Sequence, residues 1–417
     1  MLIKKEEPMK KNLLVAQSGG PTAAINATLA GIIEAAVQAE CIDTVYGAFN
    51  GIKGILEERF INLSKTIDDA DKLDMLSRTP AAALGSCRFK LNDIEKDDSQ
   101  YKQIIEIFNK HNIGYFIYIG GNDSMDTVLK ISEYCKKCGI DDIKVMGAPK
   151  TIDNDLCGID HCPGFGSAAK YIATVFSELE RESVVYDAKN VIVVEMMGRH
   201  AGWLTAAAAL SQNVNGKVPY LIYLEERVFD IDRFIEDVKE KLETNTAVMV
   251  AVSEGVHDAD GRFICEQGQG EVEKDVFGHS KLTGTGKILE EAIRAKIGCK
   301  VRSIELNLLQ RCAAHVMSKT DIEESKNLGA FAVQYATEGV SGKMSSLVRK
   351  SSNPYEVEYT SVDISQVANH EKKVPTDWIN EAGNGVNEKM LEYLKPLVQG
   401  ELSSVYVDGV PQYVVLK

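Results

Sequence analysis

The chain has 417 residues, of which 44% are hydrophobic and 26% are charged, so it is long enough for two packed cores. Its 47 Lys and Arg against 61 Asp and Glu give a net charge of −14, which makes nucleic acid and anionic membranes unfavourable partners. The longest apolar runs are far shorter than the roughly 20 residues that span a bilayer. The charged N-terminal residues do not resemble a signal peptide, so we expect a cytoplasmic protein.

Short apolar runs alternate with helical patterns along the chain, which predicts an α/β fold with mainly parallel sheets covered by helices. In chain order, we expect strands at 13–17, 115–119, 145–148, 191–196, 221–224 and 247–253, and helices at 23–39, 124–138 and 287–296. Each strand ends in glycine or charged residues. Open α/β sheets bind ligands at that edge.

The C-terminal part has a weaker pattern than the rest. Residues 163–166 are a plausible crossing between two lobes, and residues 258–273 are predicted to form an exposed excursion. Beyond about Lys350, we expect only a short helix near 386–397 and an edge strand or hairpin at 405–415.

Three motifs are weaker than their letters indicate. Gly164 to Ala169 matches a dinucleotide fingerprint but follows a loop instead of a strand, and Gly284 to Lys287 lacks the first glycine and the hydroxyl of a phosphate loop. The nine cysteines are odd in number and scattered, which favours reduced thiols. A zinc site could be drawn only from residues on a helix end and in a loop, namely Cys135, Cys138, Cys157, His161 and Cys162.

Two glycine pairs follow predicted strands and precede predicted helices. Gly19-Gly20 and Gly120-Gly121 should present unpaired backbone amides and the positive end of a helix dipole, which suits phosphate. Asn122, Asp123 and Ser124 add oxygen ligands beside the second pair. Each pair alone could equally be a tight structural turn.

The loop after the strand at 145–148 contains a hydroxyl, a cation and two carboxylates: Lys150, Thr151, Asp153 and Asp155. In an extended loop, Asp153 and Asp155 would share a face while Asn154 points away. Carboxylates beside phosphate make sense with Mg²⁺ between them or as a base for a hydroxyl nucleophile, and phosphoryl transfer needs both. Arginines that suit phosphate lie near other predicted strand ends, namely Arg88, Arg199, Arg302 and Arg311.

Together these motifs resemble those of the 6-phosphofructokinases. Their order and spacing hold from about Leu13 to Lys343, and residues 149–155 are highly specific. The matching segments are Gly19 to Asn26, Leu84 to Arg88, Gly120 to Ser124, Pro149 to Asp155, Met197 to Gly202, Ser253 to Gly255 and Leu309 to Arg311.

This resemblance implies a role for each matching residue. Asp153 would be the general base for the sugar's 1-hydroxyl, with Thr151 and Asp155 beside it. Arg88 and Arg199 would stabilise the charge on the transferred phosphoryl group. The other implied contacts are Met197, Gly198 and Glu254 to the sugar, Arg302 and Arg311 to its 6-phosphate, Gly20, Lys150 and Ser124 to the donor phosphates, and Asn122 to Mg²⁺.

Two positions bear on the phosphoryl donor. Family members that use ATP resemble this chain but have Gly at the positions of Asp123 and Lys150, whereas pyrophosphate-using members have Asp and Lys. A carboxylate at 123 would repel the α-phosphate of ATP, and Lys150 supplies a point charge that suits compact pyrophosphate. The resemblance therefore implies reversible, Mg²⁺-assisted transfer of phosphate from pyrophosphate to fructose 6-phosphate, in glycolysis and gluconeogenesis.

The chain departs from the family at two positions, which keeps alternatives open. Asn122 replaces the aspartate expected to bind Mg²⁺, and Leu308 replaces a His or Tyr near the sugar phosphate. The alternatives are an ATP-dependent 6-phosphofructokinase, a sedoheptulose 7-phosphate kinase and a non-catalytic sensor of sugar phosphates.

The resemblance also implies an organisation into lobes and subunits. Residues 12–164, with about 312–340, would form the N-terminal lobe that binds the donor, and residues 165–311 the lobe that binds the sugar phosphate. Residues 345–417 would be a C-terminal extension without an assigned role. Because sites in this family draw residues from neighbouring subunits, we expect a homodimer or homotetramer.

Overall fold

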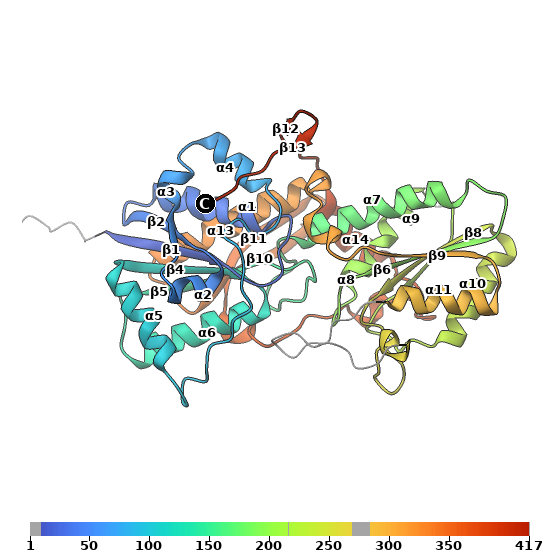
Figure 1. Ribbon diagram of the computed structural model, residues 1–417, viewed down its shortest axis with the longest axis horizontal. Helices are drawn as coiled ribbons and strands as arrows, with labels where there is room; N and C mark the ends of the chain where they lie inside the picture. The colour runs from blue at the N-terminus through green and yellow to red at the C-terminus, as the bar shows by residue number, and fades with distance from the viewer. Residues whose placement is uncertain (1–9, 216, 269–283, 417) are drawn as a thin grey trace, which may run out of the picture.

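The computed structural model describes residues 10–215, 217–268 and 284–416. Figure 1 shows two lobes side by side, each with its own sheet flanked by helices. This architecture confirms the predicted α/β fold with mainly parallel sheets.

The first lobe contains a seven-stranded sheet in the order β11-β10-β5-β4-β1-β2-β3. The strands from β10 to β2 run parallel, while β11 and β3 pair antiparallel at the two edges. The bounds are β1 (Lys11–Gln17), β2 (Ile42–Ala48), β3 (Phe60–Asn62), β4 (Ile113–Gly120), β5 (Lys144–Pro149), β10 (Lys343–Ser352) and β11 (Tyr355–Asp363).

Helices cover both faces of this sheet because consecutive side chains of its buried central strand point to opposite faces. Leu13 and Val15 of β1 pack in one cluster with α1 and α13, while Leu14 and Ala16 pack in another with α5 and α6. The helices of this lobe are α1 (Ile25–Gln38), α2 (Gly51–Leu56), α3 (Leu63–Thr66), α4 (Ala70–Ser77), α5 (Ser99–Lys110), α6 (Asn122–Lys137) and α13 (Lys319–Thr337).

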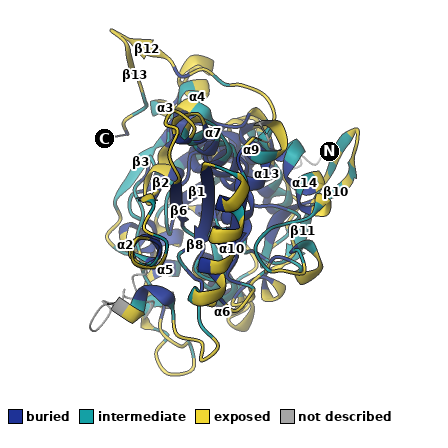
Figure 2. Cartoon of the chain, turned by 90° about the vertical axis from the view of Figure 1, so that its right-hand side faces the viewer, coloured by how far each residue is buried: buried dark blue, intermediate teal, exposed yellow. Residues whose placement is uncertain are grey.

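The second lobe contains a four-stranded parallel sheet in the order β7-β8-β6-β9. Its strands are β6 (Asn190–Met196), β7 (Tyr220–Tyr223), β8 (Ala247–Ser253) and β9 (Lys300–Glu305). Figure 2 shows β6 and β8 buried behind α10, whose outer face is exposed. The helices are α7 (Phe165–Ser183), α8 (Trp203–Ala206), α9 (Ala208–Asn215), α10 (Ile231–Thr244), α11 (Thr285–Lys296) and α12 (Leu309–Cys312), with 3₁₀ turns η1 (Ile264–Gly268) and η2 (Ala314–Val316).

The residues after 340, for which the sequence indicated no role, contribute to both lobes. β10 and β11 complete the first sheet, and Ile364 and Val367 lie in the first lobe's core. Val374, Met390 and Leu394 lie in the core of the second lobe. The elements here are η3 (Ile364–Gln366), η4 (Thr376–Trp378), α14 (Glu388–Leu394), η5 (Lys395–Val398), β12 (Tyr406–Val407) and β13 (Val410–Pro411), and the last two form the predicted hairpin.

Other local predictions have mixed outcomes. Gly284 caps α11 with a φ of 97°, as expected for a turn, and Gly164 caps α7 without a preceding strand. The excursion at 258–273 is only partly exposed where it is described, since Ile264 and Cys265 are buried; residues 269–273 lie outside the described residues. Across the described ranges, no helix has the length and apolarity to cross a membrane.

Candidate active site

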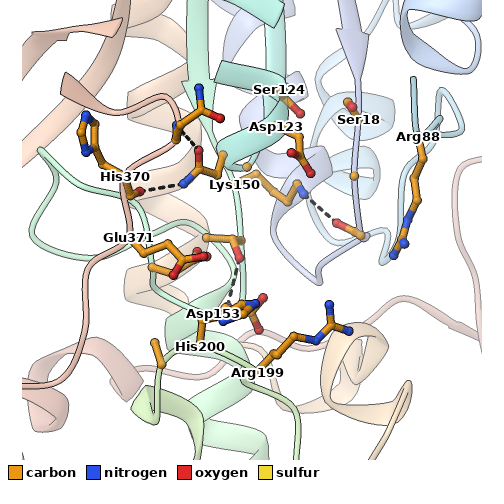
Figure 3. Close-up of a pocket in the computed structure, with 18 of the residues that line it drawn as sticks. Ser18, Arg88, Asp123, Ser124, Lys150, Asp153, Arg199, His200, His370 and Glu371 are labelled. Carbon is orange, nitrogen blue, oxygen red and sulfur yellow. Dashed lines mark hydrogen bonds between the residues drawn. The ribbon is translucent and has the colours of Figure 1, made fainter. Parts of the chain in front are cut away.

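A polar cavity of about 590 Å³ lies between the two lobes. The loops after β1, β4 and β5 form its first-lobe side, and the loops after β6 and β8 form its second-lobe side. Figure 3 shows Asp123, Lys150, Asp153 and Arg199 arranged around this space. Because parallel strands end at the same edge of a sheet, residues that are far apart in the sequence meet here.

Lys150 lies at the centre of the first-lobe side and is buried, with 3% of its surface exposed. Its backbone N donates to the carbonyl of Gly120 at 3.0 Å, directly after β5 ends. Its Nζ donates to the carbonyl of Gly20 at 2.7 Å. Burial lowers the pKa of Lys150 to about 8, an effect that the charges of Asp153 and Asp155 oppose.

Asp153 and Asp155 both line the cavity, although the loop that carries them is not extended. Asn154 between them is left-handed, with a φ of 57°, and it is fully buried. Its Nδ2 donates to the hydroxyl of Tyr393 at 2.8 Å, and its Oδ1 accepts from the backbone N of Cys162 at 2.9 Å. These contacts turn Asn154 away from the cavity.

The carboxylates of this site are costly to ionise in the empty cavity. Burial raises the pKa of Asp153, and the neighbouring charge of Asp155 raises it further. Burial likewise raises the pKa of Asp155 and raises that of Glu254 to about 8. A cationic partner bound among them would restore their ionised forms.

Two arginines near the cavity have side-chain donors without a hydrogen-bond acceptor among the described residues. The Nε atoms of Arg199 and Arg311 are buried and have no partner among the described residues. The guanidinium of Arg311 lies against Gly20, where a Cβ would be 2.8 Å from its Nη1. Arg88 also lines the cavity. Buried, unpartnered guanidinium donors fit an anionic ligand such as phosphate.

On the second-lobe side, Gly198 and Glu254 come from adjacent strands. The backbone N of Gly198 donates to Oε1 of Glu254 at 3.4 Å, and Ser253 Oγ donates to the carbonyl of Gly198 at 2.7 Å. Gly198 has a φ of 124°, which only glycine adopts readily. Met197 is half-buried against the core of this lobe.

Four predicted site residues do not line the cavity: Met197, Gly198, Arg302 and Arg311. Gly198 and Arg311 contact residues that do line it, namely Glu254 and Gly20, and Met197 directly precedes Gly198. Arg302 lies elsewhere. It is exposed on β9, and it lines a separate cavity of about 290 Å³ together with Tyr186 and Lys300. The two arginines expected at the sugar's 6-phosphate, Arg302 and Arg311, therefore lie apart within the chain.

Asn122 and Ser124 line the first-lobe side at the start of α6. Both polar atoms of the Asn122 side chain contact the C-terminal part of the chain: Oδ1 accepts from the backbone N of Asn369 at 2.5 Å, and Nδ2 donates to the carbonyl of His370 at 2.6 Å. Figure 3 shows His370 and Glu371 on this side of the cavity. The oxygen predicted to bind a metal already accepts a hydrogen bond.

Sequence reasoning missed several residues that line the cavity. Cys87 and His200 lie inside motifs whose other residues were assigned roles, and Ser18 and Phe89 flank such motifs. No motif marks Asn369, His370 and Glu371, because the wall they form exists only once the chain has folded back from its C-terminal part.

Comparisons with known proteins identify the family of the chain. The family model described as phosphofructokinase matches residues 12–336. The chain is 42% identical over 409 residues to a protein of Methylococcus capsulatus named pyrophosphate–fructose 6-phosphate 1-phosphotransferase, covering 97% of this chain and 96% of that one. A protein of Xanthomonas campestris pv. campestris with the same name is also 42% identical over 409 residues, with the same coverage.

The fold of this chain is also similar to that of a solved structure. The crystal structure of the pyrophosphate-dependent phosphofructokinase from Nitrosospira multiformis superposes with a TM-score of 0.88 at 38% identity, covering 98% of this chain and 96% of that one. The cavity between two α/β lobes, the family match and the near full-length relatives lead to one conclusion: the chain belongs to the phosphofructokinase family.

Proposed function

We propose that the protein reversibly transfers phosphate from pyrophosphate to the 1-hydroxyl of fructose 6-phosphate, giving fructose 1,6-bisphosphate and phosphate. The observation that carries this proposal is the position of the buried Lys150. Its Nζ donates a hydrogen bond to the carbonyl of Gly20, and Lys150 lines the same cavity as Asp123. The names of the near full-length relatives support the same donor and acceptor.

The site has one cationic and one anionic group that discriminate between donors. Lys150 offers a compact positive charge to the small, highly charged pyrophosphate. Asp123, in the first turn of α6, would repel the α-phosphate of a nucleotide. Gly20 and Ser124 would approach the donor phosphates closely, since both line the same side of the cavity.

Asp153 is the proposed general base. Its carboxylate takes the proton from the 1-hydroxyl of the sugar while that oxygen forms a bond to the nearer phosphorus of pyrophosphate. The bond from this phosphorus to the bridging oxygen breaks, and phosphate leaves. Thr151 Oγ1 accepts from the backbone N of Asp153 at 3.1 Å and holds it in place.

Cationic side chains would stabilise the charge on the phosphoryl group in transfer. Arg88, Arg199 and Arg311 line or adjoin the cavity, and the unpartnered Nε atoms of the last two would find acceptors on phosphate. Met197, Gly198 and Glu254 would hold the sugar, and Arg311 would contact its 6-phosphate.

Enzymes of this family generally use Mg²⁺. The donor set fits that ion, because Asp123, Asp153 and Asp155 line one cavity and Mg²⁺ at such sites is held by one or two carboxylates together with substrate phosphates. Within the described residues, no cluster of three or more His, Cys, Asp or Glu side chains is arranged to hold a metal ion without the substrate. When bound, Mg²⁺ would neutralise charge on the phosphates and restore the ionised carboxylates.

Each lobe would bind one substrate. Residues 12–164 and 312–340 would bind the phosphoryl donor, and residues 165–311 would bind the sugar phosphate. Because Arg302 lies outside the cavity of its own chain, it would serve the site of a neighbouring copy in a homodimer or homotetramer. Cytoplasmic localisation is part of the same proposal.

The test compares pyrophosphate with ATP as donor, measuring initial rates with fructose 6-phosphate and Mg²⁺. We expect a large preference for pyrophosphate, which Asp123→Gly combined with Lys150→Gly should abolish. An exposed pair with the same residue types, Asp142→Gly with Lys96→Gly, is the control. A preference for ATP in the unmodified protein would contradict the proposed donor.

The remaining alternatives are separated by the same assay. A rate with sedoheptulose 7-phosphate that exceeds the rate with fructose 6-phosphate would change the acceptor. A protein that binds sugar phosphate but shows no turnover with either donor, and whose binding is unaffected by Asp153→Ala, would be a sensor.

A further inference from the structure

We infer that residues 369–374, called the crossing segment below, hold the catalytic loop (residues 150–155) in place, and that Asn122 acts as a positioning residue by fastening this segment to the first lobe. The inference rests on the proposed function, because it assigns a catalytic role to the loop. It differs from the metal-binding role that the family resemblance implied for Asn122.

The crossing segment is fastened to the first lobe by side-chain amides. Asn122 uses its oxygen for the backbone N of Asn369 and its nitrogen for the carbonyl of His370, at 2.5 and 2.6 Å. Asn369 in turn donates from Nδ2 to Oδ1 of Asp126 at 3.2 Å. An amide suits position 122, because its oxygen accepts from one backbone group while its nitrogen donates to the next.

The middle of the segment contacts the catalytic loop directly. The backbone N of Lys372 donates to the carbonyl of Asp155 at 2.7 Å, and Glu371 pairs with Leu156 in an antiparallel bridge. Lys372 Nζ donates to the carbonyl of Asp160 at 2.7 Å and to that of Ile159 at 3.2 Å. The segment thus supports the loop at its end and just beyond it.

The far end of the segment is attached to the second lobe. Trp203 Nε1 donates to the carbonyl of Lys372 at 3.0 Å, and the backbone N of Val374 donates to Oε1 of Glu226 at 2.9 Å. Lys373 pairs with Glu225 at 3.2 Å. The segment therefore connects both lobes to the loop that carries Asp153 and Asp155.

This connection matters because the loop is held in an unusual conformation. Asn154 is left-handed and buried, and its side chain contacts Tyr393 and Cys162 from outside the cavity. Without support at the carbonyl of Asp155, the two carboxylates would shift relative to the bound hydroxyl. A misplacement of about 1 Å can cost about 100-fold in rate.

The experiment compares Asn122→Asp and Asn122→Ala with the unmodified enzyme. The aspartate keeps the acceptor for Asn369 but turns an anionic oxygen toward the carbonyl of His370. Asn327→Asp is the matched control, because Asn327 is an exposed amide on α13 that donates to Tyr359 at 2.9 Å.

We expect both Asn122 variants to lose about 10-fold in kcat, with little change in KM for fructose 6-phosphate. Amide hydrogen exchange of residues 369–374, measured without Mg²⁺, should accelerate in both variants and stay unchanged in Asn327→Asp. If Asn122 bound the metal instead, Asn122→Asp would lower the Mg²⁺ concentration for half-maximal rate, keep kcat, and leave exchange without Mg²⁺ unchanged.

A second variant tests the segment from its other side. Lys372→Met removes the charge and the Nζ hydrogen bonds while keeping the length of the side chain. Combined with Asn122→Ala, its loss in kcat should be clearly less than the product of the two single losses, since both act through one segment. Fully multiplicative losses, or single variants with unchanged kcat, would overturn the inference. An unmodified enzyme without pyrophosphate-dependent turnover would instead contradict the proposed function.

Discussion

In this cavity, the ionised form of a carboxylate that the proposed reaction needs lowers the stability of the folded protein. Asp153 is half-buried next to Asp155, and its pKa is raised first by desolvation and second by the neighbouring carboxylate. Such a group stabilises the fold below its unfolded pKa, and this contribution is lost as pH rises through the folded pKa. At neutral pH, the protein therefore bears a cost for a carboxylate that the proposed reaction needs.

Asp153→Asn should separate these two demands. We expect kcat to fall by about 10²- to 10⁴-fold, because the base is removed. The melting temperature of the ligand-free protein should rise at about pH 8 and rise less at about pH 5, where the raised pKa keeps Asp153 protonated. Thermal unfolding at both pH values checks this. A variant that is less stable at pH 8 would contradict the burial argument.

The pH dependence of the rate follows from the same groups. A base with a raised pKa makes kcat/KM for fructose 6-phosphate increase with pH over a range above that of an ordinary aspartate. Because burial lowers the pKa of Lys150 to about 8, kcat/KM for pyrophosphate should fall above that pH. Rates in buffers of constant ionic strength test both limbs. An acidic limb in the ordinary carboxylate range, near pH 4, would exclude Asp153 as the group that titrates.

At the scale of elements, the first lobe depends on the close approach of α1 and α13. A Cβ at Gly31 would lie 1.9 Å from the carbonyl oxygen of Lys326, and one at Gly329 would lie 2.2 Å from that of Thr28. Both obstacles are backbone, so the helices would have to separate. α1 follows the loop that contains Gly20, which links this packing to the donor side of the cavity.

Gly31→Ala should therefore lower the free energy of unfolding by about 2 kcal/mol or more. Gly286→Ala is the control, because the nearest atom that a Cβ there would meet is the side-chain oxygen Oε2 of Glu195, at 3.3 Å. The midpoint of urea unfolding measures both. Equal midpoints for the two variants would show that α1 and α13 can move apart without cost.

At the scale of the whole molecule, the C-terminal part joins the lobes. Ile364 and Val367 are buried in the first lobe, and Val374, Met390 and Leu394 are buried in the second. The same stretch contains the crossing segment. The chain after β11 is thus needed both to complete the cores and to connect the lobes at the cavity.

Two truncations test this role. A chain that ends after Asp363 should not unfold cooperatively, because it lacks side chains that are at most 5% exposed in the second core, among them Val374, Ile379 and Met390. A chain that ends after Glu401 retains α14 and η5 and should fold with a lower melting temperature. Circular dichroism during heating distinguishes the two. Cooperative unfolding of the shorter chain would contradict an essential role in the core.

Much of the fold and of the site could be predicted from local sequence. A buried parallel strand must be a short apolar run, and a loop that binds phosphate needs glycine, so β1, β4, β5, β6 and β8 and the residues after them were recognisable. Asp153 and Lys150 were found because both belong to one short, specific motif. The backbone turn at Asn154 was not predicted, since burial against Tyr393 decides it.

The sequence by itself determined the α/β alternation, the family and the chemical groups of the cavity, because each depends on residues that are close together in the chain. Only the tertiary structure decided which distant residues complete the site. Asn122 contacts His370 across 248 positions, and Arg302 is kept away from the cavity by its place on β9. No local pattern encodes such contacts, because they form only when β10, β11 and the crossing segment bring the C-terminal part back between the lobes.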